Sequence, residues 1–121
     1  MAKILIVDDE AKIREVVKEY AMLIHGFEVE EAENGYEAIT KVEHTNFDLI
    51  VLDIMMPVMD GFTLTRNIKQ DQRFKSIPVV IHSSLTGTAN EGHVKTVGAD
   101  AYVAKFVAKE LASTIRQVLT H

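Results

Sequence analysis

Short apolar runs that each end in a polar side chain constrain the fold of this chain most. Residues 4–7 are followed by Asp8 and Asp9, 49–52 by Asp53, 79–81 by His82 and Ser83, and 101–104 by Lys105. Continuous apolar runs are typical of strands covered on both faces, as in a parallel sheet. The carboxyl ends of such strands meet at one edge, where ligands bind. The sequence therefore predicts that three carboxylates, a hydroxyl and an ammonium group converge there.

Helical patterns alternate with these strands along the chain. Apolar residues recur at helical spacing, with Val16 among them, and the expected helices cover 11–25, 36–44, 61–70, 86–97 and 109–119. Apolar and polar residues alternate over 27–32, which indicates a short edge strand. Asn34-Gly35 is expected to form a turn, and Asp60 is the expected N-cap of the third helix. Right-handed crossovers then favour one doubly wound (βα)5 domain over residues 1–121. This is an α/β, flavodoxin-like fold with a parallel sheet in the order 2-1-3-4-5.

Composition excludes several classes of protein. The 121 residues suit one domain, and 13 Lys and Arg against 18 Asp and Glu give a formal charge of −5. Without a basic cluster, direct nucleic-acid binding is not expected. The absence of Cys excludes disulfides, thiolate catalysis and cysteine-ligated zinc. No run approaches the roughly 18 apolar residues of a membrane span. No signal peptide is apparent, so we expect a cytoplasmic location without membrane insertion.

The predicted edge has the chemistry of a metal-assisted phosphoryl transfer site. Clustered carboxylates repel one another, and a divalent cation relieves this repulsion. Oxygen ligands favour Mg²⁺, with Mn²⁺ as a possible substitute. A hydroxyl at Ser83 and a cation at Lys105 could bind phosphoryl oxygens, while a carboxylate acts as nucleophile. Each residue alone has an ordinary alternative: Asp9 as a helix N-cap, Asp53 as a solvated strand end, and Lys105 as a surface charge.

The combined motif resembles the receiver domain of two-component response regulators, the CheY-like superfamily. The resemblance covers essentially the whole chain and is carried by residues 7–10, 52–61, 83 and 102–105. It implies that Asp53 accepts a phosphoryl group from a histidine kinase. It also implies that Asp8 and Asp9 hold Mg²⁺ with Asp53 and the Met55 backbone carbonyl, while Ser83 and Lys105 contact the phosphoryl group. Such a protein catalyses its own phosphorylation and dephosphorylation but is not an enzyme acting on a separate substrate.

The two halves resemble different branches of this family. Residues 1 to about 55 are similar to receivers of transcriptional regulators. From about residue 57 onward, and above all over 82–91 and 104–106, the chain is similar to the receiver of CheV-type chemotaxis coupling proteins. A stand-alone or excised receiver and a hybrid are the alternatives. Phe106 stands where the family has proline, and a cis bond before a non-proline residue costs about 2.5–4 kcal/mol, so we expect a trans linkage.

The resemblance also predicts how phosphorylation becomes a signal. Ser83 is expected to move toward the phosphoryl group, with Tyr102 as a rotameric switch. The output surface is predicted to be the helix 4–strand 5–helix 5 face, including Lys95, Tyr102 and Lys109, which would bind a downstream protein. Without the resemblance, Tyr102 is equally well an ordinary half-buried strand aromatic. Met55 and Leu85 are expected to flank the path of water to Asp53, and neither can orient water, so intrinsic hydrolysis should be slow.

Two other functions compete with this interpretation. An aspartyl phosphatase also uses Mg²⁺, carboxylates and a lysine, but it needs an acid/base Asp two residues after the nucleophile, where this chain has Met55. The second alternative is a scaffold or engineered hybrid receiver that binds partners without being phosphorylated. Metal binding that depends on Asp53 separates a working receiver from such a scaffold.

Overall fold

The computed structural model describes residues 2–22, 26–83, 95–104 and 108–119. Its strands are β1 (Lys3–Val7), β2 (Glu28–Ala32), β3 (Leu49–Leu52), β4 (Val79–Ser83) and β5 (Ala101–Ala104), and its helices are α1 (Ala11–Tyr20), α2 (Gly35–His44), α3 (Gly61–Gln70) and α5 (Ala108–Leu119). The five strands form one parallel sheet in the order β2-β1-β3-β4-β5. The predicted fold class and strand order are confirmed. Of the helix expected over 86–97, residues 86–94 lie outside the described residues.

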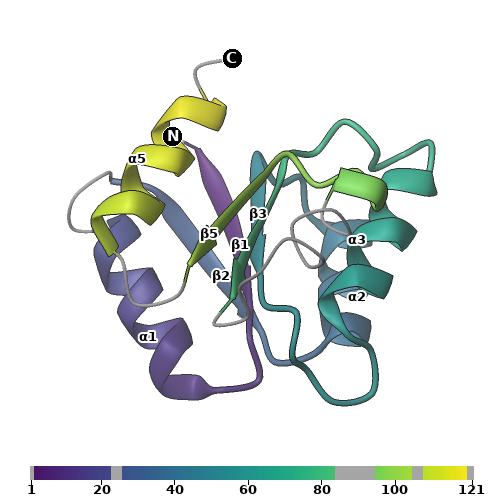
Figure 1. The fold of residues 1–121 in the computed structure, drawn as a ribbon, viewed down its shortest axis with the longest axis horizontal. Helices are drawn as coiled ribbons and strands as arrows, with labels where there is room; N and C mark the ends of the chain where they lie inside the picture. The colour runs from purple at the N-terminus through teal and green to yellow at the C-terminus, as the bar shows by residue number, and fades with distance from the viewer. Residues whose placement is uncertain (1, 23–25, 84–94, 105–107, 120–121) are drawn as a thin grey trace.

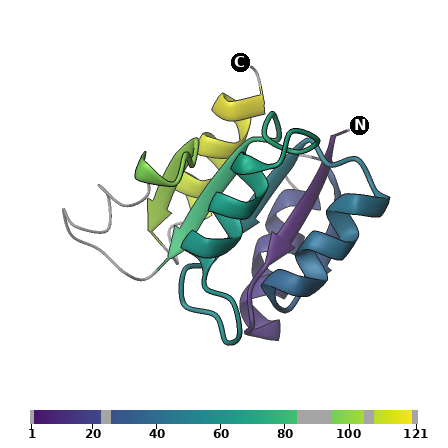
Figure 2. The same cartoon turned by 90° about the vertical axis from the view of Figure 1, so that its right-hand side faces the viewer.

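Helices cover both faces of the sheet, which explains the continuous apolar runs. In Figure 1, α1 and α5 lie on one side of the strands and α2 and α3 on the other, and Figure 2 shows the same layers turned by 90°. Side chains alternate between the faces along each strand. Leu5 and Val7 therefore pack in the core beneath α2 and α3, whereas Ile4 and Ile6 pack in the core beneath α1 and α5. Because both faces of the central strand β3 are covered, all four of its residues are apolar and buried, whereas the edge strand β2 carries glutamates.

The strand register brings the predicted site residues to one edge. Val7 pairs with Leu52, and Leu52 with Ile81. Adjacent strands lie about 4.8 Å apart. Asp8 and Asp53, each the next residue of its strand, are therefore neighbours at the carboxyl edge, the lower edge of the sheet in Figure 1.

Side-chain caps begin two of the helices at this edge. Asp60 accepts a 2.9 Å hydrogen bond from the Thr63 amide, so its predicted N-cap role is confirmed. Asn34 accepts one of 2.9 Å from the Glu37 amide at the start of α2. The predicted Asn34-Gly35 turn is wrong, because Asn34 is the N-cap and Gly35 already belongs to the helix.

The first helix buries a narrower stripe than its sequence pattern predicts. The regular α-helix ends at Tyr20. The chain continues through Ala21 and Met22 in a wider, π-type turn, and residues 23–25 lie outside the described residues. Val17 is buried, but Val16 is 57% exposed, so its predicted place on the apolar face is wrong. The reason is geometric: adjacent residues on a helix are about 100° apart, and this helix contacts the sheet along one stripe.

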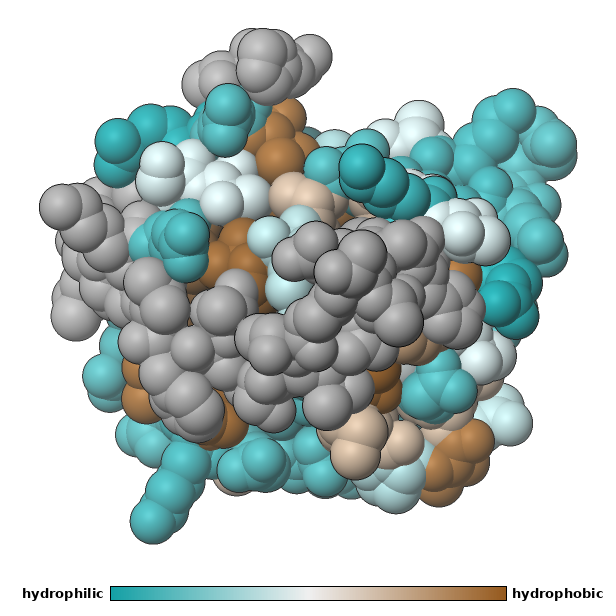
Figure 3. Space-filling model, viewed as in Figure 1, coloured by the Kyte–Doolittle hydropathy of each residue, from teal (hydrophilic) through white to brown (hydrophobic). Residues whose placement is uncertain are grey.

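On the face drawn in Figure 3, the described residues are largely hydrophilic, with separate hydrophobic patches. Among all the described residues, the large exposed apolar side chains are Val16, Met22, Tyr36, Met55 and Val58. Within the described ranges, no helix is long and apolar enough to cross a membrane. Two of the exposed side chains, Met55 and Val58, lie in the loop between β3 and α3, beside the carboxyl edge.

Candidate functional site

Asp8 and Asp53 extend the hydrogen-bonded ladder one residue beyond their strands. The Asp53 amide donates to the Val7 carbonyl at 3.1 Å, and the Asp8 amide donates to the Ala32 carbonyl at 3.1 Å. Both residues are only 3% exposed. The backbone therefore fixes two buried carboxylates side by side at the edge of the sheet.

Three consecutive carboxylates form a candidate cation site. Oxygen atoms of Asp8, Asp9 and Glu10 lie within 4.8 Å of one another. Asp8 is buried and the other two are exposed, and the Glu10 amide donates a 2.9 Å hydrogen bond to Asp8 Oδ1. An all-oxygen donor set that is half open to water suits Mg²⁺, which keeps several waters when bound. Sequence reasoning missed Glu10, although its position directly after two predicted ligands was a signal.

The Asp53 carboxylate is held by its own backbone. Its Oδ1 accepts a 2.8 Å hydrogen bond from the Ile54 amide. The Ile54 carbonyl in turn accepts hydrogen bonds from the Met56 amide at 3.1 Å and from the Gly61 amide at 2.9 Å. These bonds turn the loop back toward the end of β3 directly after Asp53. Met55 is the residue between Ile54 and Met56 in this turn, and its side chain is exposed. The predicted metal contact of the Met55 carbonyl stays a prediction.

The same loop carries backbone strain and borders an open hollow. Val58 has a φ of 71°, in the left-handed region that β-branched residues rarely adopt. Such a residue costs on the order of 1–3 kcal/mol and often marks a functional loop. The hollow is lined by Asp9, Ile54, Met55, Met56, Pro57, Asp60 and Phe62. Met55 and Asp9 thus face one open space beside the buried carboxylates, through which a phosphodonor could approach.

The remaining predicted site residues are placed only in part. β4 ends at Ser83, whose backbone pairs with Ala104, the residue before Lys105. The side chain of Ser83 and the whole of Lys105, Phe106 and Leu85 lie outside what the structure describes, as does the side chain of Lys109. Tyr102 is half-buried against the core beneath α2 and α3, and Lys95 is exposed. The structure thus places Asp8 and Asp53 at neighbouring strand ends and Asp9 and Met55 along one hollow, and it leaves the phosphoryl-binding pair untested.

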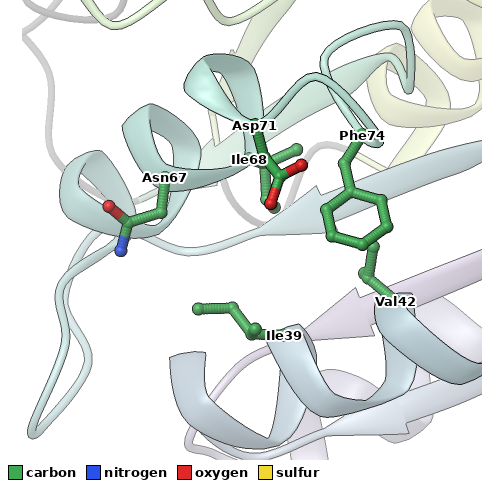
Figure 4. Close-up of a pocket in the computed structure, with 6 residues that line it drawn as sticks. All are labelled: Ile39, Val42, Asn67, Ile68, Asp71 and Phe74. Atoms are coloured by element: carbon green, nitrogen blue, oxygen red, sulfur yellow. The ribbon is translucent and has the colours of Figure 1, made fainter.

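A second pocket, of about 130 Å³, lies between α2 and α3 and lacks this chemistry (Figure 4). It is lined by Ile39, Val42, Asn67, Ile68, Asp71 and Phe74. Hydrogen bonds from the Arg73 guanidinium, at 3.1 and 2.8 Å, hold the pKa of Asp71 below its usual value. The one carboxylate of this pocket, that of Asp71, is therefore ionised and already paired with Arg73, so this pocket is not the cation site.

Comparison with known proteins identifies the family. The model of the response regulator receiver domain matches residues 4–116, and the chain belongs to this family. It is 37% identical over 118 residues to the transcriptional regulatory protein ResD of Bacillus subtilis, covering 97% of this chain and 48% of ResD. It is 39% identical over 103 residues to a gliding motility regulatory protein of Myxococcus xanthus, covering 85% of this chain and 13% of that protein. The chain thus spans about half the length, or less, of these relatives.

Solved structures agree with this assignment. Chemotaxis protein CheY4 of Vibrio cholerae superposes with a TM-score of 0.89 and 34% identity, covering 98% of each chain. Response regulator TrrA of Thermotoga maritima, solved in complex with Mg²⁺ and BeF, gives a TM-score of 0.86 and 34% identity, covering 98% of this chain and 99% of TrrA. Receiver domains are phosphorylated by histidine kinases and act on downstream targets, and Mg²⁺ is general to the family. The CheV-like half and the hybrid origin stay predictions.

Proposed function

We propose that residues 1–121 form one receiver domain in which Asp53 is the phosphoacceptor. Asp53 is a buried carboxylate whose backbone lies beside that of Asp8, the buried member of the carboxylate cluster, and this observation carries the proposal. The Ile54 amide orients this carboxylate through Oδ1, and a carboxylate oxygen of Asp53 is the attacking atom. An O–P bond forms as the P–N bond of the kinase phosphohistidine breaks. The imidazole nitrogen keeps the electron pair and takes up a proton, and Asp53 becomes an acyl phosphate.

Asp8, Asp9, Asp53 and the Met55 carbonyl are the proposed ligands of Mg²⁺, with Mn²⁺ as a substitute. All offer oxygen ligands at one edge of the sheet, and the Glu10 carboxylate lies within 4.8 Å of those of Asp8 and Asp9. When bound, Mg²⁺ would neutralise charge on the phosphoryl oxygens. The protein residues contribute the nucleophile and its fixed orientation.

We propose how phosphorylation is passed on to a partner protein from family membership and the strand register. Ser83 and Lys105 would bind the phosphoryl oxygens, and Tyr102, two residues before Ala104, would report their movement. The helix 4–strand 5–helix 5 face, with Lys95 and Lys109, would then bind a downstream protein, without direct contact to nucleic acid. We propose that the domain is a switch rather than a turnover enzyme. Its cytoplasmic location stays a prediction.

Intact mass after incubation with acetyl phosphate and Mg²⁺ tests the proposal. We expect one added phosphoryl group that requires Mg²⁺ and is absent from the Asp53→Asn variant. Asp60→Asn is the matched control: it makes the same chemical change in the same loop, and Asn caps a helix as well as Asp does. An unmodified wild-type protein that also fails to bind beryllofluoride would support the phosphorylation-independent scaffold instead. An adduct that persists in Asp53→Asn would move the phosphoacceptor elsewhere.

The exposed Met55 side chain predicts a long-lived phosphoryl group. Met55 is 62% exposed and lines the hollow beside Asp9, but a thioether cannot orient an attacking water. We expect Met55→Asn to accelerate loss of the phosphoryl group severalfold, measured by intact mass after the donor is removed. Val58→Asn introduces the same amide in the same loop, outside the hollow, and should leave the decay rate unchanged. Equal decay rates in the wild type and Met55→Asn would contradict this role.

A further inference from the structure

The geometry points to Arg14 as a positioning residue that holds the carboxylate loop for metal binding. Arg14 lies on the first turns of α1, and its Nη1 donates a 2.5 Å hydrogen bond to the backbone carbonyl of Asp8. Its own amide donates to the Glu10 carbonyl at 3.1 Å. One residue therefore contacts both ends of the segment that carries the proposed ligands. The inference rests on the proposed function, because it concerns the same metal site.

Glu31 on the edge strand anchors the Arg14 side chain. Arg14 Nε donates to Glu31 Oε1 at 3.1 Å, and Lys18 Nζ reaches Glu31 Oε2 at 3.4 Å. The Arg14 side chain is only 14% exposed, so this ion pair is poorly solvated and held in one geometry. A guanidinium can make both bonds at once because its donors are set in a planar fork. The result is a continuous link from β2, through Arg14, to the main chain of Asp8.

The start of α1 has no side-chain cap, so the Arg14 side chain is what ties the segment before this helix to the edge strand. At the start of α1, the N-cap residue Glu10 makes no side-chain capping hydrogen bond. Asn34 and Asp60, by contrast, cap α2 and α3 at the same edge of the sheet. Before α1, the proposed ligand Asp8 instead accepts the Glu10 amide through its side chain, so the position of this carboxylate depends on how the segment is held. Groups that orient ligands in this way typically change metal affinity by about 10–100-fold when they are replaced.

The charge of Arg14 does not oppose this role. A guanidinium close to a cation site would repel the cation if it were unpaired. Here its charge is offset by Glu31, and the atom it contacts in the loop is a neutral carbonyl. Replacement by lysine keeps the charge and removes the fork, so it separates positioning from electrostatics.

Arg14→Lys, compared with the wild type, tests the inference. We expect Mg²⁺ to bind about 10-fold more weakly, measured by amide chemical shifts during a Mg²⁺ titration. We also expect faster hydrogen exchange at the Glu10 amide in the absence of Mg²⁺, because that amide bonds to the Asp8 side chain. The rate of phosphorylation by acetyl phosphate should recover at saturating Mg²⁺. Loss of folding stability alone would not produce this combination.

Two glutamates of the edge strand supply the matched control. Glu31→Gln removes the partner of Arg14, so it should lower the affinity for Mg²⁺, as Arg14→Lys does. Glu30→Gln removes the same charge from the same strand, but Glu30 pairs with Lys3 and Lys41 and should leave the affinity unchanged. If Arg14→Lys binds Mg²⁺ as tightly as the wild type, the inference is overturned and the proposed function stands. If the wild-type protein binds no Mg²⁺, the proposed metal site and the inference both fail.

Discussion

Replacing Gly61 with alanine is expected to destabilise the domain by roughly 2–4 kcal/mol, a large part of the 5–15 kcal/mol typical of a whole domain. A Cβ atom at this position would lie 2.1 Å from the Asp53 carbonyl oxygen and 2.8 Å from the Ile54 Cα. Both are backbone atoms at the end of a buried strand, so neither can move aside as a side chain does. Chemical denaturation, followed by far-UV circular dichroism, measures the loss.

Gly35→Ala is the matched control, because Gly35 and Gly61 are each the first residue of a capped helix at the same edge. A Cβ at Gly35 would lie 2.6 Å from Met59 Sδ, the flexible part of a side chain that can rotate away. We expect this variant to lose no more than about 1 kcal/mol. If the two variants unfold at the same denaturant concentration, the close approach of Gly61 to Asp53 does not restrict the site.

Asp8→Asn is expected to weaken Mg²⁺ binding by at least about 10-fold, since cation affinity depends on the number of charged ligands. Asp8 is the buried member of the carboxylate cluster, and the backbone fixes it next to Asp53. Its side-chain oxygen also accepts the Glu10 amide, so the change removes a charge without removing the atom that receives this bond. Isothermal titration of Mg²⁺ measures the affinity, and the rise in melting temperature with added Mg²⁺ should shrink in parallel.

Asp48→Asn controls for net charge in this experiment. Asp48 accepts the Lys3 amide at 2.8 Å at the opposite, amino end of β1, and its replacement changes the total charge by the same amount. Mg²⁺ affinity should stay at the wild-type value in this variant. A similar loss of affinity in both variants would mean that Mg²⁺ responds to overall charge rather than to a site at the carboxyl edge.

Local pattern was enough to predict the sheet and the carboxylates at its edge. The four residues of β3 are all buried, as expected for a central strand that reads as an uninterrupted apolar run. Crossover handedness then gives the strand order, and the strand order brings Asp8 and Asp53 together. The N-cap at Asp60 was also predictable, since a cap depends on residues only three positions apart.

Contacts between distant segments could not be predicted in the same way. Whether Asn34 begins a helix or a turn, and whether Val16 is covered, depends on how α1 and α2 are placed on the sheet. The Arg14 bond to Glu31 joins residues 17 positions apart, and it forms only because β2 lies beside β1. Gly61 meets Asp53 for the same kind of reason, a loop folded back on a strand end. The sequence by itself determined the elements, their order and the carboxylates of the edge, because these follow from local periodicity and chain handedness. The tertiary structure decided how the carboxylates are held, because that depends on packing and register between segments.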